Sequence, residues 1–259
     1  MRRAGRLFAA AGLLAGIDGC GGDVPAPPAS PAVVTAETAP PPTAPHADPP
    51  AGPRPTEAQT AFRKLVGAQD AEAAKAAEKR LDELGADALP AYVEGLSGDE
   101  ATRQFAAMRL AQLGIDAAPA ADALVKALAD PSPVVRVNAG SALSILEDAR
   151  RAQAVPVLAK LLDGQPEYIA RTAAIALGNF EEQAAEAVPA LGQALSADDA
   201  ELRKWAASTL GRIGPPAQAA APALEKLAAN DEDAEVRAAA REALERLRPK
   251  PEPPAAEPA

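Results

Sequence analysis

The feature that most constrains this chain is a helical sequence pattern that returns six times between residues 71 and 248, with a period near 33 residues. The clearest copies are residues 135–139 (VRVNA), 202–206 (LRKWA) and 236–240 (VRAAA). A period of this length is typical of stacked units of supersecondary structure, each too small to bury its own apolar face. We therefore expect the units to share one core and to present a long surface to other macromolecules.

Each copy has the pattern of a helix with one apolar stripe. An aliphatic residue, an alanine four residues later and a pair of mostly leucine residues fall at i, i+4, i+8 and i+11, which is one side of a 3.6-residue helix. The alanine column predicts a place where another helix approaches closely. Its members are Ala77, Ala106, Ala139, Ala173, Ala206 and Ala240.

A second, shorter helix is predicted between successive copies, at residues 156–162, 189–195 and 222–227, with looser copies at 90–96 and 123–128. Three of these segments begin with prolines 33 residues apart, a position where the first turn of a helix tolerates proline. Predicted N-caps precede the first helices, and glycines mark the turns to the second helices. The caps are Asp70, Asp99, Ser132, Asp199 and Asp233, and the glycines are Gly85, Gly114 and Gly214. The pattern predicts an all-α chain of about five and a half helix–turn–helix units.

Two segments carry a family resemblance. Residues 130–143 (DPSPVVRVNAGSAL) and 202–227 (LRKWAASTLGRIGPPAQAAAPALEKL) resemble HEAT repeats, in the short bacterial form also described as phycobiliprotein-lyase-type repeats. The match is best at residues 199–228 and weakest at 70–97, where Ala74 replaces the arginine of the pattern. In the fourth copy Ala170 occupies that column and Arg171 follows one residue late. The resemblance implies a right-handed α-solenoid over residues 56–248, and it implies little about function because the fold hosts scaffolds, receptors and a few enzymes.

The N-terminus has the pattern of an export signal. Three arginines precede an apolar run at residues 7–17, which is too short to span a bilayer, and Cys20 follows it closely. Residues 1–19 with Cys20 resemble a bacterial lipoprotein signal and its acylated cysteine, although Asp18 fits that motif poorly. The prediction is an exported cell-envelope protein with an N-terminal lipid anchor. The alternative is an ordinary secretory signal with Cys20 incidental, giving a secreted or soluble periplasmic protein.

The segments that flank the repeats are rich in proline and alanine. Residues 20–55 and 249–259 contain few large apolar side chains, so they cannot bury enough surface to offset the entropy of ordering. We expect a disordered tether before the repeats and a disordered tail after them.

Few side chains in the repeats are suited to catalysis. The chain has one histidine, His46, and one cysteine, Cys20, and both precede the repeats. We expect no catalytic residue, metal or cofactor, and we interpret the acidic run at residues 231–233 as a helix start. The net charge of −10 disfavours nucleic acid as a partner, because phosphate binding needs clustered cations.

Four arginines occupy one column of the repeat: Arg103, Arg136, Arg203 and Arg237. They could form a ladder for an acidic partner, or they could bond the loop carbonyls and acidic residues of adjacent units, as the equivalent arginine does in the resembled family. We favour the structural interpretation. Of the scarce aromatic residues, Tyr92 lies in a predicted core column, whereas Trp205 could cover the groove to the next repeat or anchor a partner.

Two functional hypotheses remain. The first is a non-enzymatic, membrane-tethered scaffold that binds another protein along the face of the second helices, whose exposed column includes Glu94, Lys160, Gln193 and Lys226, with Lys126 adjacent. The second is a lyase-like or chromophore-handling enzyme, which only the name of the resembled repeats suggests.

Overall fold

A computed structural model describes residues 55–147 and 149–248, and these residues form helices and connecting loops without a β-strand. The predicted signal peptide, Cys20, the tether and the tail lie outside the described residues, apart from the last residue of the tether range, Pro55.

The helices follow the repeat. An additional helix, α1 (Pro55–Val66), precedes six first helices: α2 (Ala71–Leu84), α4 (Glu100–Gln112), α6 (Pro133–Ile145), α8 (Glu167–Gly178), α10 (Ala200–Ile213) and α12 (Ala234–Leu247). The second helices are α3 (Leu89–Gly95), α5 (Ala121–Ala127), α7 (Val155–Lys160), α9 (Val188–Ala194) and α11 (Ala221–Asn230). The all-α repeat predicted from the sequence is confirmed.

The connections between first and second helices are more regular than the sequence suggested. Where we predicted turns, the structure has short 3₁₀ helices: η1 (Gly85–Ala88), η2 (Gly114–Ala120), η3 (Ala149–Ala154), η4 (Glu181–Ala187) and η5 (Pro215–Ala220). Their alanines, such as Ala117, Ala184 and Ala217, are fully buried. A 3₁₀ turn needs few residues to complete its hydrogen bonds, so it fits a connection that must also fill the core.

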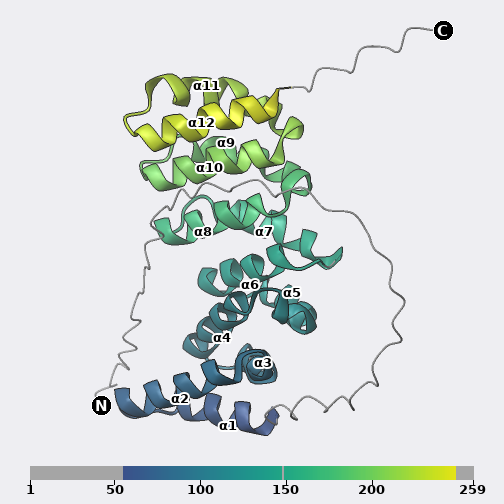
Figure 1. Ribbon diagram of the computed structural model, residues 1–259, viewed down its shortest axis with the longest axis vertical. Coiled ribbons are helices and arrows are strands. Elements are labelled where there is room, and N and C mark those ends of the chain that lie inside the picture. The colour runs from purple at the N-terminus through teal and green to yellow at the C-terminus, as the bar shows by residue number, and fades with distance from the viewer. Residues whose placement is uncertain (1–54, 148, 249–259) are drawn as a thin grey trace, which may run out of the picture. The chain divides into compact units, whose positions relative to one another are not determined.

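Neighbouring repeats stack through like elements. Each first helix from α4 onward contacts the next first helix, and each second helix packs on the first helix of its own repeat or the next (Figure 1). This arrangement is an α-solenoid, in which each unit gains its core from its neighbours.

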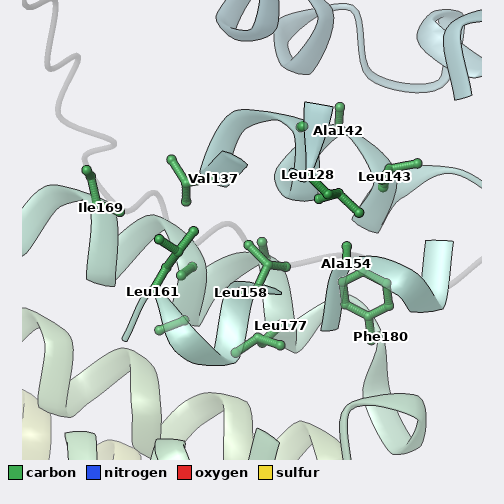
Figure 2. Packing of buried hydrophobic residues seen from close by; sticks show 14 of the residues in the cluster. Leu128, Val137, Ala142, Leu143, Ala154, Leu158, Leu161, Ile169, Leu177 and Phe180 are labelled. Carbon is green, nitrogen blue, oxygen red and sulfur yellow. The ribbon is translucent and has the colours of Figure 1, made fainter. Parts of the chain in front are cut away.

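The core consists of the predicted columns. All six alanines of the alanine column are buried, as is Tyr92. In the middle repeats, Leu143, Leu158 and Leu177 are fully buried and come from three successive helices, α6, α7 and α8 (Figure 2). Small residues permit this packing: a Cβ added at Gly140 would lie 2.7 Å from the Leu158 side chain.

Four of the five predicted N-caps are confirmed. The side chains of Asp70, Asp99, Asp199 and Asp233 accept hydrogen bonds from backbone N–H groups in the first turns of their helices. The prediction for Ser132 was wrong. Its hydroxyl makes no cap and accepts a hydrogen bond from Gln104 Nε2 of the preceding repeat at 2.9 Å.

Candidate functional site

The face of the second helices carries the predicted polar column. Lys126, Lys160, Gln193 and Lys226 are exposed, and each lies two residues after a fully buried leucine of its own helix. The sequence analysis placed Lys126 beside this column. The structure places it within the column, because its buried neighbour Leu124 corresponds to Leu158 of the next second helix.

Two grooves cross this face at consecutive repeat junctions. The first, between α7 and α9, has a volume of about 680 Å³ and is lined in part by Lys160 and Gln193. The second, between α9 and α11, has a volume of about 520 Å³ and is lined in part by Lys226 and Asn230. Ala190, Gln193 and Ala194 in the first groove correspond, 33 residues later, to Ala223, Lys226 and Leu227 in the second. The two grooves are therefore one feature of the repeat, which the structure presents twice. We call them the paired grooves.

The paired grooves contain both signs of charge. Asp163 and Glu186 line the first groove with Lys160, and Asp198 and Glu232 line the second with Lys226. The sequence analysis did not single out these acidic residues. Asp163 and Asp198 could have been found from the sequence, because they follow the second helices α7 and α9 by a few residues and so recur with the repeat.

The three lysines of the face differ from most cations of the array. Within residues 55–147 and 149–248, no ion pair joins Lys126, Lys160 or Lys226 to a carboxylate, whereas Arg80, Arg103, Arg109, Arg150, Arg203 and Lys204 all have acidic partners. An ammonium group without an internal partner is available to an external carboxylate or carbonyl.

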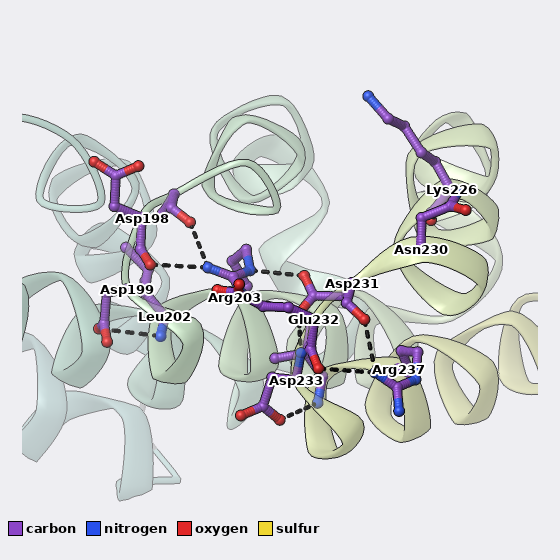
Figure 3. A network of polar contacts seen from close by, with 12 residues as sticks. Asp198, Asp199, Leu202, Arg203, Lys226, Asn230, Asp231, Glu232, Asp233 and Arg237 are labelled. Carbon is purple, nitrogen blue, oxygen red and sulfur yellow. Dashed lines mark hydrogen bonds and ion pairs between the residues drawn. The ribbon is translucent and has the colours of Figure 1, made fainter.

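The end of the α9–α11 groove is fixed by a buried ion pair (Figure 3). Arg203 donates through Nε and Nη2 to the two carboxylate oxygens of Asp231, at 2.8 and 3.0 Å, and through Nη1 to the carbonyls of Ala197 and Asp198, both at 2.9 Å. The hydrogen bond from Arg203 holds the pKa of Asp231 below its usual range, and the bond to Asp231 raises the pKa of Arg203. One side chain thus ties α10 to the loops on both sides of the groove.

The rest of the arginine column is also structural, as we expected. Arg103 forms the same bidentate pair with Asp130, and Arg136 and Arg237 donate to loop carbonyls at 2.7 to 3.0 Å. In the irregular fourth copy, Arg171 lies 3.1 Å from the carboxylate of Asp199 and so still reaches the next repeat.

The acidic run at residues 231–233 is part of this framework. Asp231 accepts from Arg203 and from the backbone N–H of Asp233, and Asp233 caps α12. Among the described residues, no group of three or more His, Cys, Asp or Glu side chains is placed to hold a metal ion. No helix in the described part of the chain has the length and apolar character needed to cross a membrane.

Trp205 is not brought together with the lysines. It lies on the first helix α10, half-buried against the core, and the ammonium group of Lys204 sits 5.7 Å from its ring centre. The residues that line the paired grooves do not include it.

Comparisons with known proteins agree with this architecture. A family model described as HEAT repeats matches residues 89–177 and 155–245. An engineered protein of known structure shares 25% sequence identity with a TM-score of 0.56, covering 74% of this chain and 96% of its own. A computationally designed armadillo repeat protein for modular peptide recognition shares 24% identity with a TM-score of 0.54, covering 73% of this chain and 99% of its own.

A natural protein has a similar fold at lower identity. The karyopherin Kap121p, in a structure bound to the extreme C-terminus of the protein phosphatase Cdc14p, shares 15% identity with a TM-score of 0.53, covering 74% of this chain and 25% of its own. A search of curated proteins finds no match to this chain.

Proposed function

This chain belongs to the HEAT-repeat family, whose fold generally mediates protein–protein interaction, and we propose that it is a non-enzymatic scaffold that binds another protein along the paired grooves. The observation that carries this proposal is the recurrence of one groove at consecutive repeat junctions, with Lys160, Gln193 and Lys226 exposed along it.

The grooves suit an extended segment of a partner. Their walls include small side chains such as Ala159, Ala190 and Ala194, which let a peptide backbone approach the helices closely. Adjacent packed helices lie roughly 8–10 Å apart, and an extended chain advances about 3.3 Å per residue, so one repeat corresponds to about three partner residues. Carboxylates of the partner would face the lysines, and its basic side chains would face Asp163 and Asp198.

The absence of catalysis is part of the proposal. The side chains that line the paired grooves include neither histidine nor cysteine, and their arginine, Arg203, is committed to Asp231. Nothing in this arrangement favours the alternative of a lyase-like or chromophore-handling enzyme.

We further propose that the array is held at a membrane of the cell envelope by acylated Cys20. The support is the order of the N-terminal sequence: arginines, a short apolar run, then the only cysteine of the chain. Residues 20–55 would then separate the array from the lipid surface by up to roughly 100 Å when extended.

Charge reversal tests the binding face. In the full chain, Lys126→Glu, Lys160→Glu and Lys226→Glu together should weaken capture of a partner from envelope extracts at least tenfold, because three groups available to the partner become repulsive. The control is Lys64→Glu, Lys75→Glu and Lys79→Glu on α1 and α2, which reaches the same net charge through lysines that are also exposed.

Thermal unfolding should hardly change in either variant, because exposed substitutions away from caps and core usually stay within about 0.5 kcal/mol. If the control variant loses the partner and the first variant keeps it, the binding face is wrongly assigned.

A further inference from the structure

The exposed side of the first helices carries a second surface of unusual character. Within the described residues, the large hydrophobic side chains that are exposed are Met108, Ile115, Ile145, Tyr168 and Ile175. All but Ile115 lie on three successive first helices, α4, α6 and α8, which contact one another in that order (Figure 1). We call the exposed side of α4, α6, α8 and α10 the outer strip.

The centre of the outer strip is uncharged. The polar side chains of Asn138 and Thr172 donate to the carbonyls of Val134 and Tyr168 in their own helices, at 2.9 and 2.7 Å, and so present little polarity outward. The arginine of α6, Arg136, is bound to loop carbonyls. A neutral, partly apolar patch on a chain of net charge −10 is the place where another protein surface can approach with least repulsion.

Large and small side chains alternate along the outer strip. Two residues after the alanine column, the successive first helices carry Met108, Ser141, Ile175 and Ser208. We propose that the outer strip binds a second copy of this chain about a two-fold axis that runs parallel to the helices between α6 and α8. This axis reverses the order of the helices in the second copy, so Met108 faces Ser208 and Ile175 faces Ser141.

The charges beyond the strip fit the same axis, which brings α2 opposite α12 of the second copy. At matching positions of the repeat, α2 carries Lys79 and then Glu83, whereas α12 carries Glu242 and then Arg246. Opposite signs therefore meet at both positions. Complementary charges at the edges of a neutral centre select this orientation over its alternatives.

The first experiment measures mass. The full chain carrying Cys20→Ser, which removes its only thiol, should sediment at micromolar concentration with twice the chain mass of 26.3 kDa. Ile175→Glu should raise the dimer dissociation constant at least tenfold, because a two-fold axis places each substitution in the interface twice. The matched control is Ile115→Glu, an exposed isoleucine outside the strip, which should leave the dimer intact. A wild-type monomer at every concentration, or loss of the dimer only in the control, would overturn the proposal.

The second experiment tests the register. In the Cys20→Ser background, one chain carries Ser141→Cys and another carries Ile175→Cys. On oxidation, an intermolecular disulfide should form in the mixture and not in either variant alone, since the axis places residue 141 opposite residue 175. A disulfide-linked dimer from one variant alone, with none in the mixture beyond it, would refute this axis.

Discussion

At the scale of single residues, the most informative exception to the repeat is Glu181. The turns after α2, α4 and α10 use Gly85, Gly114 and Gly214 with φ of 52, 58 and 74°, and Glu181 occupies the same turn position after α8 with φ of 51°. A side chain in the left-handed region costs roughly 1–2 kcal/mol, which glycine avoids. The repeat tolerates this strain because the flanking residues Phe180 and Ala184 are buried and hold the turn in place.

Glu181→Gly should therefore stabilise the array by about 0.5–1 kcal/mol, since the relieved strain exceeds the added flexibility of the unfolded chain. Chemical denaturation measures the change. Glu182→Gly is the control: its φ is not positive, so it should be neutral or destabilising. Equal effects of the two substitutions would contradict this explanation.

The arginine column predicts a graded loss of stability. Arg203→Met leaves the buried carboxylate of Asp231 without its partner and should cost about 3–5 kcal/mol, whereas Arg237→Met removes two bonds to carbonyls and should cost about 1–2 kcal/mol. Urea unfolding of the two variants gives the comparison, and a larger loss for Arg237→Met would show that the ion pair is not the stronger tie.

The same pair predicts a pH dependence. Because the folded-state pKa of Asp231 is lowered, its stabilising contribution is full above the unfolded value near 3.9 and is lost as the pH falls through the folded value. The difference in unfolding free energy between wild type and Asp231→Asn should therefore be largest from about pH 5 upward and shrink toward pH 2. A difference that grows on acidification would contradict the sign.

At the scale of elements, most of the architecture could be predicted from the sequence, because the period of the repeat fixes which residues share a column. The alanine column, the prolines of the second helices and four of the five caps follow from local chemistry. The failure at Ser132 has a different origin: its hydroxyl is taken by Gln104 of the preceding repeat, and a contact between repeats leaves no local signal. The acidic residues of the paired grooves were missed because the sequence analysis followed the helices and not the loops after them.

Glycines in helices of similar sequence should respond in opposite ways. Gly192 on α9 has open space around an added Cβ, so Gly192→Ala should stabilise by about 0.5–1 kcal/mol through helix propensity. At Gly211 on α10, the added Cβ would lie 2.8 Å from Ala243 Cα, which is backbone of α12, so Gly211→Ala should destabilise by about 1–3 kcal/mol. Thermal unfolding of the two variants measures both, and stabilisation at Gly211 would mean that α10 and α12 are not packed this closely.

At the scale of the whole molecule, the account combines a HEAT-repeat array with a proposed lipid anchor. If Cys20 is acylated, Cys20→Ala should move the chain from the membrane fraction to the soluble fraction while the array remains folded. Mass spectrometry of the mature N-terminus provides the independent check, and a wild-type N-terminus without lipid would refute the anchor.

The central claim is that a partner protein binds the paired grooves, and site-specific photo-crosslinking tests it most directly. A photoreactive phenylalanine analogue replaces Gln193 in the second-helix column, or Gln218 in η5 as the matched control, since both are exposed glutamines. The account predicts a discrete adduct from position 193 that is lost when Lys126, Lys160 and Lys226 are reversed, and no such adduct from position 218. An adduct from position 218 alone, or one from position 193 that survives the charge reversal, would contradict it.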